Sequence, residues 1–265
     1  MKFGFNVFDK PVEEYFDYAV EHGLNHLEID LIKDHSLLET FTTDRIVHIR
    51  ELAEQHRISL SLHTPYTLNP SDRRSGYRDE TIAYLIRCIR LAKEMQALHI
   101  TTHIGFFWGM PIIKRIRKNA LNRLILSLKQ VLVECELHKV SLALENASPK
   151  PLDSVSFFLG DNIYDFKYIF QQIHSSFIKL CLDIGHANIN EGPLKYIEQF
   201  GDKIINVHFH DNRGKIDNHL VIGEGTVPWD LTIAALNQLN FQGPYVSECF
   251  KIKPHEAVNL LKSHF

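Results

Sequence analysis

The sequence predicts an α/β protein with a single domain over residues 1–265, a (β/α)8 TIM barrel. Short β-rich runs alternate with long amphipathic runs along the whole chain, giving eight strand–helix units. No Pro-, Gly- or Ser-rich linker separates these units. Regular β–α alternation implies parallel strands joined by helical crossovers. Eight units in about 250 residues is the size of such a barrel.

The eight strands are expected in short runs of β-forming residues. They occupy residues 2–8, 26–31, 58–64, 99–105, 140–147, 178–186, 204–210 and 244–250. Between them, residues 78–96 place apolar side chains at i, i+3, i+4 and i+7, the period of an amphipathic helix. Residues 11–23 begin with proline and end at glycine, as a helix does, and residues 227–243 repeat this pattern.

An open, doubly wound sheet is the alternative arrangement of alternating strands and helices. Such sheets bind dinucleotides at a glycine-rich turn after the first strand. No Gly-x-Gly-x-x-Gly sequence follows residues 2–8, which weakens this alternative.

The composition is that of an ordinary globular protein, with 45% hydrophobic and 23% charged residues and a formal net charge of −3. This charge gives no general attraction to nucleic acids or membranes. The first residues lack the layout of a signal peptide, and no apolar run approaches the ~20 residues that span a bilayer. The 4 cysteines form no Cys-x-x-Cys pair, which favours reduced thiols and a cytoplasmic location.

The 16 histidines are unusually many, and ionisable residues stand at the carboxyl ends of seven predicted strands in a row. From the second strand to the eighth, these residues are Glu28 and Asp30, His63, His103, Glu145, Asp183, His208 and Glu248. His186 follows shortly after Asp183, and Asp217 and His219 lie in the loop after His208. A barrel enzyme carries its functional groups at the carboxyl ends of its strands. The placement therefore predicts that these side chains converge on one mouth.

Each of these residues alone has a structural explanation. A strand-end histidine is usually a hydrogen-bonded structural group, Asp183 before "IGH" fits a helix N-cap, and residues 223–225, "GEG", fit a tight turn. The whole set is different, because several carboxylates in one low-dielectric mouth repel one another and raise each other's pKa. A divalent cation removes that conflict, and neutral imidazoles complete its coordination sphere. The set predicts one to three divalent ions, with zinc, manganese and iron all compatible.

The motifs "SLHTPY", "THIG", "ALENA", "CLDIGHA", "NVHFHD", "DNHLVIGEG" and "SECF" together resemble the xylose-isomerase-like barrel superfamily, across essentially the whole chain. That group includes sugar isomerases and epimerases and endonuclease IV. The resemblance implies a shared metal site of Glu145, Asp183, His208 and Glu248, with Glu145 bridging two ions. It also implies the further ligands of a trinuclear site: His63, His103, His186, Asp217 and His219.

Two enzyme classes and one binding class follow from the resemblance. In the epimerases, residues matching Glu145 and Glu248 bind metal and exchange a proton at a carbon beside a carbonyl, which leads us to expect a sugar or sugar-phosphate substrate. The rival is an abasic-site phosphodiesterase acting on DNA, which the complete nine-ligand set and Tyr66 with Asn69 favour. The "LDIGH" stretch lacks that nuclease group's Thr-Cys pair, and residues 31–44 offer little basic charge, with only Lys33 before Arg45. A barrel that only binds a ligand is the third class.

Five further residues are expected to support the site by contacting ligands or substrate. Glu28 and His210 are interpreted as lying behind the metal ligands, Glu28 by orienting a histidine through its other ring nitrogen. Tyr66 and Trp108 are candidates for the substrate mouth, with "GFFWGMP" supplying aromatic side chains. Arg213, with Lys215, is a candidate for a substrate phosphate. Barrels of this type frequently form homo-oligomers, but no interface can be identified from the sequence.

Overall fold

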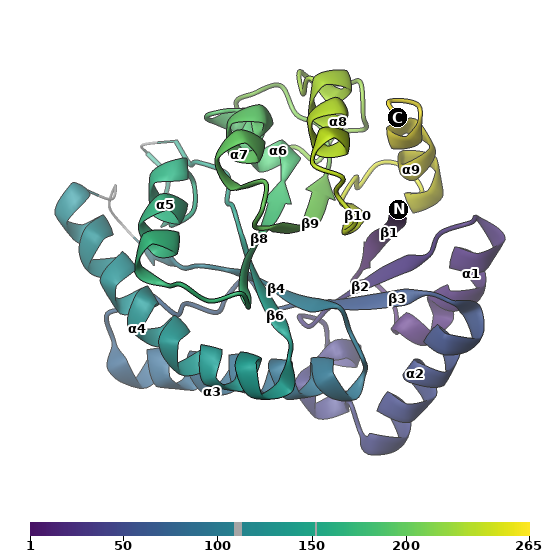
Figure 1. The fold of residues 1–265 in the computed structure, drawn as a ribbon, viewed down its shortest axis with the longest axis horizontal. Coiled ribbons are helices and arrows are strands. Elements are labelled where there is room, and N and C mark those ends of the chain that lie inside the picture. The colour runs from purple at the N-terminus through teal and green to yellow at the C-terminus, as the bar shows by residue number, and fades with distance from the viewer. Residues whose placement is uncertain (109–112, 152) are drawn as a thin grey trace.

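Eight parallel strands close into a barrel, which confirms the predicted fold class. The structure is a computed structural model that describes residues 1–108, 113–151 and 153–265. The barrel strands are β1 (Lys2–Val7), β2 (His26–Asp30), β3 (Ser59–His63), β4 (His99–His103), β6 (Ser141–Glu145), β8 (Ile178–Asp183), β9 (Ile204–Phe209) and β10 (Pro244–Ser247). Strands that follow one another in this list pair in parallel, and β1 pairs with both β2 and β10, which closes the ring (Figure 1).

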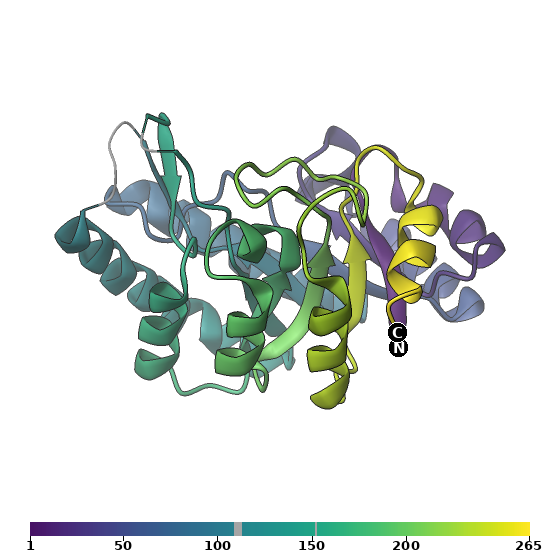
Figure 2. The same ribbon diagram turned by 90° about the horizontal axis from the view of Figure 1, so that it is seen from above.

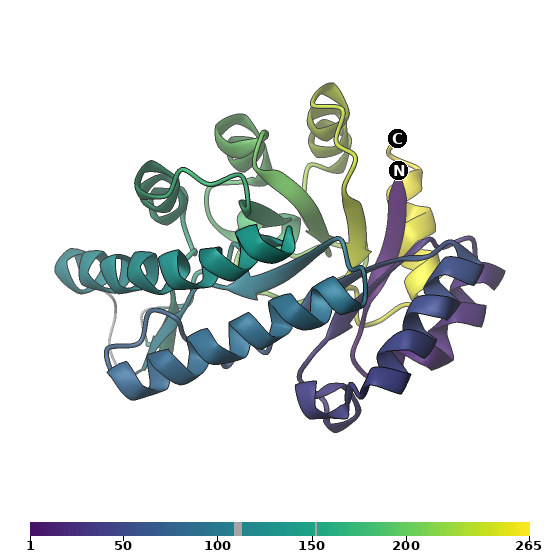
Figure 3. The ribbon, with the colours of Figure 1, turned by 60° about the horizontal axis from the view of Figure 1, so that its bottom comes forward.

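Helices surround the ring. They are α1 (Phe16–Glu21), α2 (Thr43–His56), α3 (Ser75–Glu94), α4 (Lys114–His138), α5 (Ile163–Gln172), α6 (Ile184–Ile189), α7 (Pro193–Phe200), α8 (Trp229–Gln238) and α9 (Pro254–Lys262), with 3-10 turns at Val12–Tyr15, Asp34–Ser36 and Leu38–Thr40. The long helices α3 and α4 lie side by side (Figure 3). The segment expected as one helix over residues 11–23 begins instead with a 3-10 turn before α1. Among the described residues, no helix is long and apolar enough to span a bilayer.

Two short strands outside the barrel are absent from the sequence prediction. β5 (Phe106–Trp108) and β7 (Ser156–Phe158) pair antiparallel in a separate two-stranded sheet. The expected aromatic loop "GFFWGMP" is therefore partly a strand, while its residues 109–111 lie outside the described part of the chain. The partner of β5 lies about 50 residues away in sequence, and two three-residue strands carry no periodic signal of their own.

Side chains alternate along the barrel strands between an outward row that is mostly apolar and an inward row that is mostly polar. On β2, Leu27 and Ile29 are buried among apolar residues of the core. His26 and Glu28 on the same strand point the other way, toward polar groups of β3, as period-two alternation requires. The interior of this barrel is therefore lined by hydrogen-bonding groups.

Glu28 is the centre of that interior network and is fully buried. Its Oε2 accepts hydrogen bonds from Ser61 Oγ at 2.8 Å and from Asn206 Nδ2 at 2.9 Å. A third bond to Oε2 comes from Thr101 Oγ1 at 3.3 Å, and Oε1 lies 2.6 Å from His208 Nε2. Burial opposes ionisation of Glu28, but the charge and hydrogen bond of His208 outweigh it and hold the pKa of this carboxyl well below its usual range. One ionised carboxylate thus joins side chains from β2, β3, β4 and β9.

Replacing Glu28 by alanine should destabilise the barrel strongly, because it leaves His208 and three hydrogen-bond donors buried without their acceptor. We expect a loss of about 3–5 kcal/mol in the free energy of unfolding. Chemical denaturation of the metal-free protein measures this. The control is Glu39→Ala, which removes an exposed ion pair with Arg87 and should change the free energy by at most about 1 kcal/mol. Equal effects of the two substitutions would contradict a central role for Glu28.

Candidate metal centre

The strand-end residues predicted from the sequence gather at one rim of the barrel. Figure 2 shows the loops that follow β9 and β10 at the edge toward which the strands point. At this rim, five overlapping groups of described side chains bring potential ligand atoms within 4.8 Å of one another, and three of them, called clusters here, account for all of these residues except Asp183. The first cluster is His63, His103 and Glu145; the second is Glu145, His208 and Glu248; the third is His186, His210, Asp217 and His219. Asp183 links the second and third clusters. It forms one further group with Glu145 and His186, and another with His210 and Glu248.

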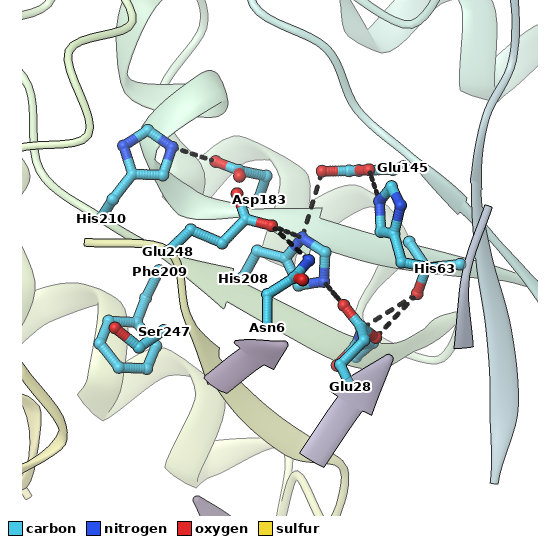
Figure 4. A network of polar contacts seen from close by, with 12 residues as sticks. Asn6, Glu28, His63, Glu145, Asp183, His208, Phe209, His210, Ser247 and Glu248 are labelled. Carbon is cyan, nitrogen blue, oxygen red and sulfur yellow. Dashed lines mark hydrogen bonds and ion pairs between the residues drawn. The ribbon is translucent and has the colours of Figure 1, made fainter. Parts of the chain in front are cut away.

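Glu145 joins the first and second clusters through its two carboxylate oxygens (Figure 4). Its Oε2 lies 2.9 Å from His63 Nε2 and 3.4 Å from His103 Nε2. Its Oε1 lies 3.2 Å from His208 Nδ1 on the other side. This carboxylate therefore lies between the first and second clusters, and its role as a bridge between two ions stays a prediction.

The second cluster is centred on Nδ1 of His208. Oε1 of Glu145 and Oε1 of Glu248 each lie 3.2 Å from this nitrogen. Asp183 stands beside His208 in the β8–β9 register. Two carboxylates thus approach the same imidazole nitrogen, and His208 itself is completely buried.

The third cluster brings a helix residue and a loop to the end of β9. Oδ2 of Asp217 lies 3.0 Å from His186 Nε2, and its Oδ1 lies 3.5 Å from His219 Nε2. His186 is held in place because Asp183 caps α6: its Oδ1 accepts a 2.6 Å hydrogen bond from the backbone N–H of His186. The N-cap expected for Asp183 and its place among the potential ligands are therefore compatible.

Backbone carbonyls fix which ring nitrogen of several histidines faces the clusters. Nδ1 of His63 contacts the Thr64 carbonyl, Nδ1 of His186 the Asn146 carbonyl and Nδ1 of His219 the Glu248 carbonyl, each at 2.8 Å. A carbonyl can only accept, so each Nδ1 carries the proton. When these rings are neutral, Nε2 therefore holds the lone pair that a metal needs.

His208 is held in the opposite orientation. Its Nε2 faces Glu28, which can only accept when ionised, so a neutral His208 presents its lone pair on Nδ1 toward Glu145 and Glu248. This is the position in which a histidine ligand is oriented by a carboxylate on its other ring nitrogen. It is the arrangement that the sequence analysis expected for Glu28.

The side chains at the rim suit a divalent ion. Among the described residues, Asp183 Oδ2, Asp217 Oδ1, His103 Nδ1 and His210 Nε2 are buried without a hydrogen-bond partner. Buried polar atoms are rarely left unpaired, and a bound ion is one way of pairing them. Mixed imidazole and carboxylate donors suit zinc, manganese and iron.

In the metal-free protein, protons take up part of the negative charge. Burial lowers the pKa of His63, but the hydrogen bond and charge of Glu145 outweigh burial and raise it to about 10. Burial is likewise outweighed at His219, where Asp217 and Glu248 raise the pKa to about 9. Burial raises the pKa of Glu248, yet the charge and hydrogen bond of His208 bring it down to about 2. These groups therefore form imidazolium–carboxylate pairs at neutral pH.

Metal binding should release protons, because His63 and His219 carry protons at neutral pH and only the neutral ring binds a metal. The apparent affinity for Mn²⁺ should rise from pH 7 to about 10, the higher of the two pKa values, by about tenfold per pH unit for each histidine that is still protonated. The rise should end once the pH exceeds the pKa values of both histidines. Titrations across this range, with proton release followed by an indicator dye, measure the effect. An affinity independent of pH would contradict the arrangement.

Asp211 organises the loop that carries Asp217 and His219. Its carboxylate accepts hydrogen bonds from five donors: the backbone N–H groups of Asn212, Gly223, Gly225 and Val227, and Nε1 of Trp229. A Cβ at residue 225 would lie 2.1 Å from Asp211 Oδ1, so the close approach requires glycine. Backbone hydrogen bonds between Asp211 and Leu220 close the loop. The "GEG" sequence therefore allows the chain to wrap around one buried carboxylate.

A cavity of about 720 Å³ opens at the rim. Seven potential ligands line it: His63, His103, Glu145, His186, Asp217, His219 and Glu248. Tyr66 also lines the cavity, as expected for a residue at the mouth. Trp108 and Arg213 are not among the lining residues; Trp108 is 70% exposed on β5, and Arg213 is exposed in the loop after β9.

Sequence reasoning missed several polar residues of the barrel interior, although the signal was present. Ser61, Thr101 and Asn206 each stand two residues before a predicted ligand and therefore point to the same side of the strand. His210 was expected behind the ligands, but the structure places its Nε2 in the third cluster. The chain keeps its alternation one residue past the end of β9, so the ring still points inward.

Comparison with known proteins agrees with this fold. The profile of the family described as "Xylose isomerase-like TIM barrel" matches residues 16–263. Fructoselysine 3-epimerase of Shigella flexneri is 25% identical over 82% of this chain and 78% of its own length. A probable endonuclease 4 of Natranaerobius thermophilus is 27% identical over 69% of this chain and 66% of its own length. A crystal structure of a D-tagatose 3-epimerase-like protein superposes with a TM-score of 0.85 at 24% identity, covering 100% of this chain and 97% of that protein.

Proposed function

The chain belongs to the xylose isomerase-like TIM barrel family, and on that premise we propose that it is a divalent-metal-dependent epimerase or isomerase of a sugar or sugar phosphate. One observation carries the proposal. Glu145 and Glu248 approach the same nitrogen of His208 at 3.2 Å, and both line the cavity. Two carboxylates that face one substrate space are what proton transfer on either side of a carbon requires.

The proposed reaction uses the two glutamates as acid and base. Their pKa values lie below the usual range, because nearby imidazolium charge outweighs the effect of burial, so both are ionised at neutral pH. One carboxylate takes the proton from the carbon beside a carbonyl. The second carboxylate first takes up a proton from solvent water and then donates it, to the same carbon from the other face in an epimerase or to the neighbouring carbon in an isomerase. The first carboxylate afterwards returns its proton to solvent. Glu145, Asp183, His208 and Glu248 would hold a divalent ion, which when bound polarises the carbonyl oxygen.

The rest of the cavity is suited to a sugar. Aromatic side chains are among the lining residues and can stack on the apolar face of a sugar ring: Phe5, Phe8, Tyr15, Tyr66 and Phe250. Lys33, Lys150 and Lys253 also line the cavity and can pair with a substrate phosphate. They are better placed for that role than Arg213, which lies outside the cavity lining. The epimerase named among the relatives acts on a sugar derivative and agrees with this substrate class.

An abasic-site phosphodiesterase is the second candidate function. The complete first and third clusters favour it, because such an enzyme uses several ions to produce hydroxide and hold the leaving oxygen. The similarity to a probable endonuclease 4 points the same way. Against it, the three lysines are the only basic side chains of the described cavity lining apart from the histidines of the clusters, and they give little charge for gripping a DNA backbone.

The proposal is tested by hydrogen exchange at a sugar carbon. Metal-loaded protein in deuterated water should incorporate deuterium into a ketose or ketose phosphate, followed by NMR across a substrate panel. Glu145→Gln and Glu248→Gln should each lower the rate by about 10²–10⁴-fold, because each removes an acid/base group. Glu224→Gln, an exposed glutamate in the loop after β9, is the matched control and should leave the rate unchanged.

Metal content is measured for each variant, so that lost ligation is distinguished from lost proton transfer. Incision of an abasic-site duplex that disappears in Asp217→Ala would overturn the proposal in favour of the phosphodiesterase. No exchange and no incision in fully metal-loaded protein would leave a ligand-binding barrel.

A further inference from the structure

Asp30 is a carboxylate of the cavity wall that neither the clusters nor the proposed reaction uses. It is the last residue of β2 and follows Glu28 on the inward side of that strand, one step nearer the rim. It lines the cavity, yet it belongs to none of the five groups of potential metal ligands among the described residues. Its carboxylate is therefore available to a molecule that enters the cavity.

The fold gives one oxygen of this carboxylate no partner. Oδ1 of Asp30 is buried and, within the described part of the chain, has no hydrogen-bond partner. The backbone carbonyl of Asp30, by contrast, holds the following turn, because it accepts a 2.6 Å hydrogen bond from Ser36 Oγ. The nearby lysine, Lys33, places its Nζ 6.0 Å from the centroid of the Phe8 ring. Burying a carboxylate oxygen unpaired is costly unless a ligand supplies the missing donor.

A second unpaired acceptor stands on the neighbouring strand. Asn6 of β1 is the register partner of Glu28 and also lines the cavity. Its Nδ2 donates a 3.5 Å hydrogen bond to Glu248 Oε1 (Figure 4), whereas its Oδ1 is buried without a partner among the described residues. Asn6 and Asp30 thus offer one unpaired oxygen each at the β1–β2 side of the mouth, beside one of the two proposed acid/base glutamates.

Both oxygens require a hydrogen-bond donor that comes from the cavity. An amide oxygen accepts only, and so does an ionised carboxylate. A phosphate group would bring further acceptors and negative charge to this wall, so it does not fit here. A sugar hydroxyl is a neutral donor. Because a ketose carries hydroxyls on successive carbons, one molecule held beside Glu248 can supply a donor to each of the two residues.

We propose that Asp30 and Asn6 form a hydroxyl-recognition subsite, which selects a polyhydroxylated substrate and rejects the analogue that lacks the recognised hydroxyl. A site built to bond a hydroxyl discriminates strongly against the deoxy compound, because that compound leaves the buried acceptors of the site unpaired. The inference rests on the proposed function, since it takes the ligand of the cavity to be a sugar. It adds which wall of the cavity reads the sugar, and through which chemical group.

Hexitols are suitable probes, because they carry the hydroxyls of a hexose but no carbonyl, so their binding does not depend on the reaction. The zinc-loaded full-length protein is titrated calorimetrically with sorbitol, mannitol and galactitol, and at least one of them should bind. Asp30→Ala should weaken that binding by about tenfold or more, because it removes a charged acceptor. Asn6→Ala, which removes a neutral acceptor, should weaken it by about three- to tenfold.

Three further variants test the cause of these losses. Asp30→Asn keeps the size of the side chain and one acceptor oxygen, so it should weaken binding less than Asp30→Ala does. Asp79→Ala and Asn237→Ala replace exposed residues of the same two types and should change nothing. Zinc content should be the same in every variant, since neither Asp30 nor Asn6 is a proposed ligand. Circular dichroism verifies that each variant is folded.

Monodeoxy hexitols separate hydroxyl recognition from a general loosening of the cavity. For one position of the missing hydroxyl, the deoxy compound should bind the unaltered protein about as weakly as the complete hexitol binds Asp30→Ala. Combining that compound with Asp30→Ala should then cost little more than either change alone, because both remove the same hydrogen bond. A loosened cavity would instead weaken every deoxy compound by the same further factor.

Four results would overturn the proposal. They are a folded, zinc-loaded protein that binds no hexitol, a folded Asp30→Ala variant that binds as tightly as the unaltered protein, independent losses for every monodeoxy compound, and a preference for an amino-hexitol that Asp30→Asn abolishes. The last would identify an ammonium subsite. Hydrogen exchange into ketoses is measured separately, so hexitol binding with the predicted pattern but no exchange would contradict the proposed function and support the subsite.

Discussion

The structure depends on the electrostatic cost of gathering carboxylates at one buried rim. Glu145, Asp183, Asp217 and Glu248 lie at the rim, and Glu28 lies directly below it. Like charges this close, in a medium of low dielectric, repel strongly unless cations lie among them. In the metal-free protein, histidines with raised pKa values supply that charge as imidazolium. Divalent ions can replace those protons at the same positions, which makes proton and metal competitors for one set of side chains.

The polar barrel interior gives this rim its rigidity. A bare carboxylate beneath the site would be expensive, but Glu28 accepts three hydrogen bonds and faces His208. Because these donors sit on β3, β4 and β9, the orientation of His208 is fixed by the barrel itself. The loop after β9 is held differently, by the five donors around Asp211. The site thus combines a rigid strand-borne part with a loop-borne part that depends on local hydrogen bonds.

Much of this architecture could be predicted from the sequence because strand ends in a closed barrel converge whatever the loops do. The alternation of strands and helices predicts the ring, and the ring brings the six strand-end ligands to one rim without any contact being known in advance: His63, His103, Glu145, Asp183, His208 and Glu248. What could not be predicted depends on packing in three dimensions. The pairing of β5 with β7 has no periodic signal, and the place of His210 depends on the absence of a side chain at Gly185. Tyr66 reaches the cavity, whereas Trp108 and Arg213 do not. This difference depends on the path that the chain takes after each barrel strand, which the sequence does not reveal.

The central claim is that these side chains surround divalent ions. Anomalous X-ray diffraction from crystals grown with zinc or manganese tests it most directly. The account predicts an anomalous peak about 2.0–2.3 Å from His208 Nδ1 and carboxylate oxygens of Glu145, Asp183 and Glu248. Saturating metal with no peak among these four residues, or with ions bound only at the outer surface, would contradict it.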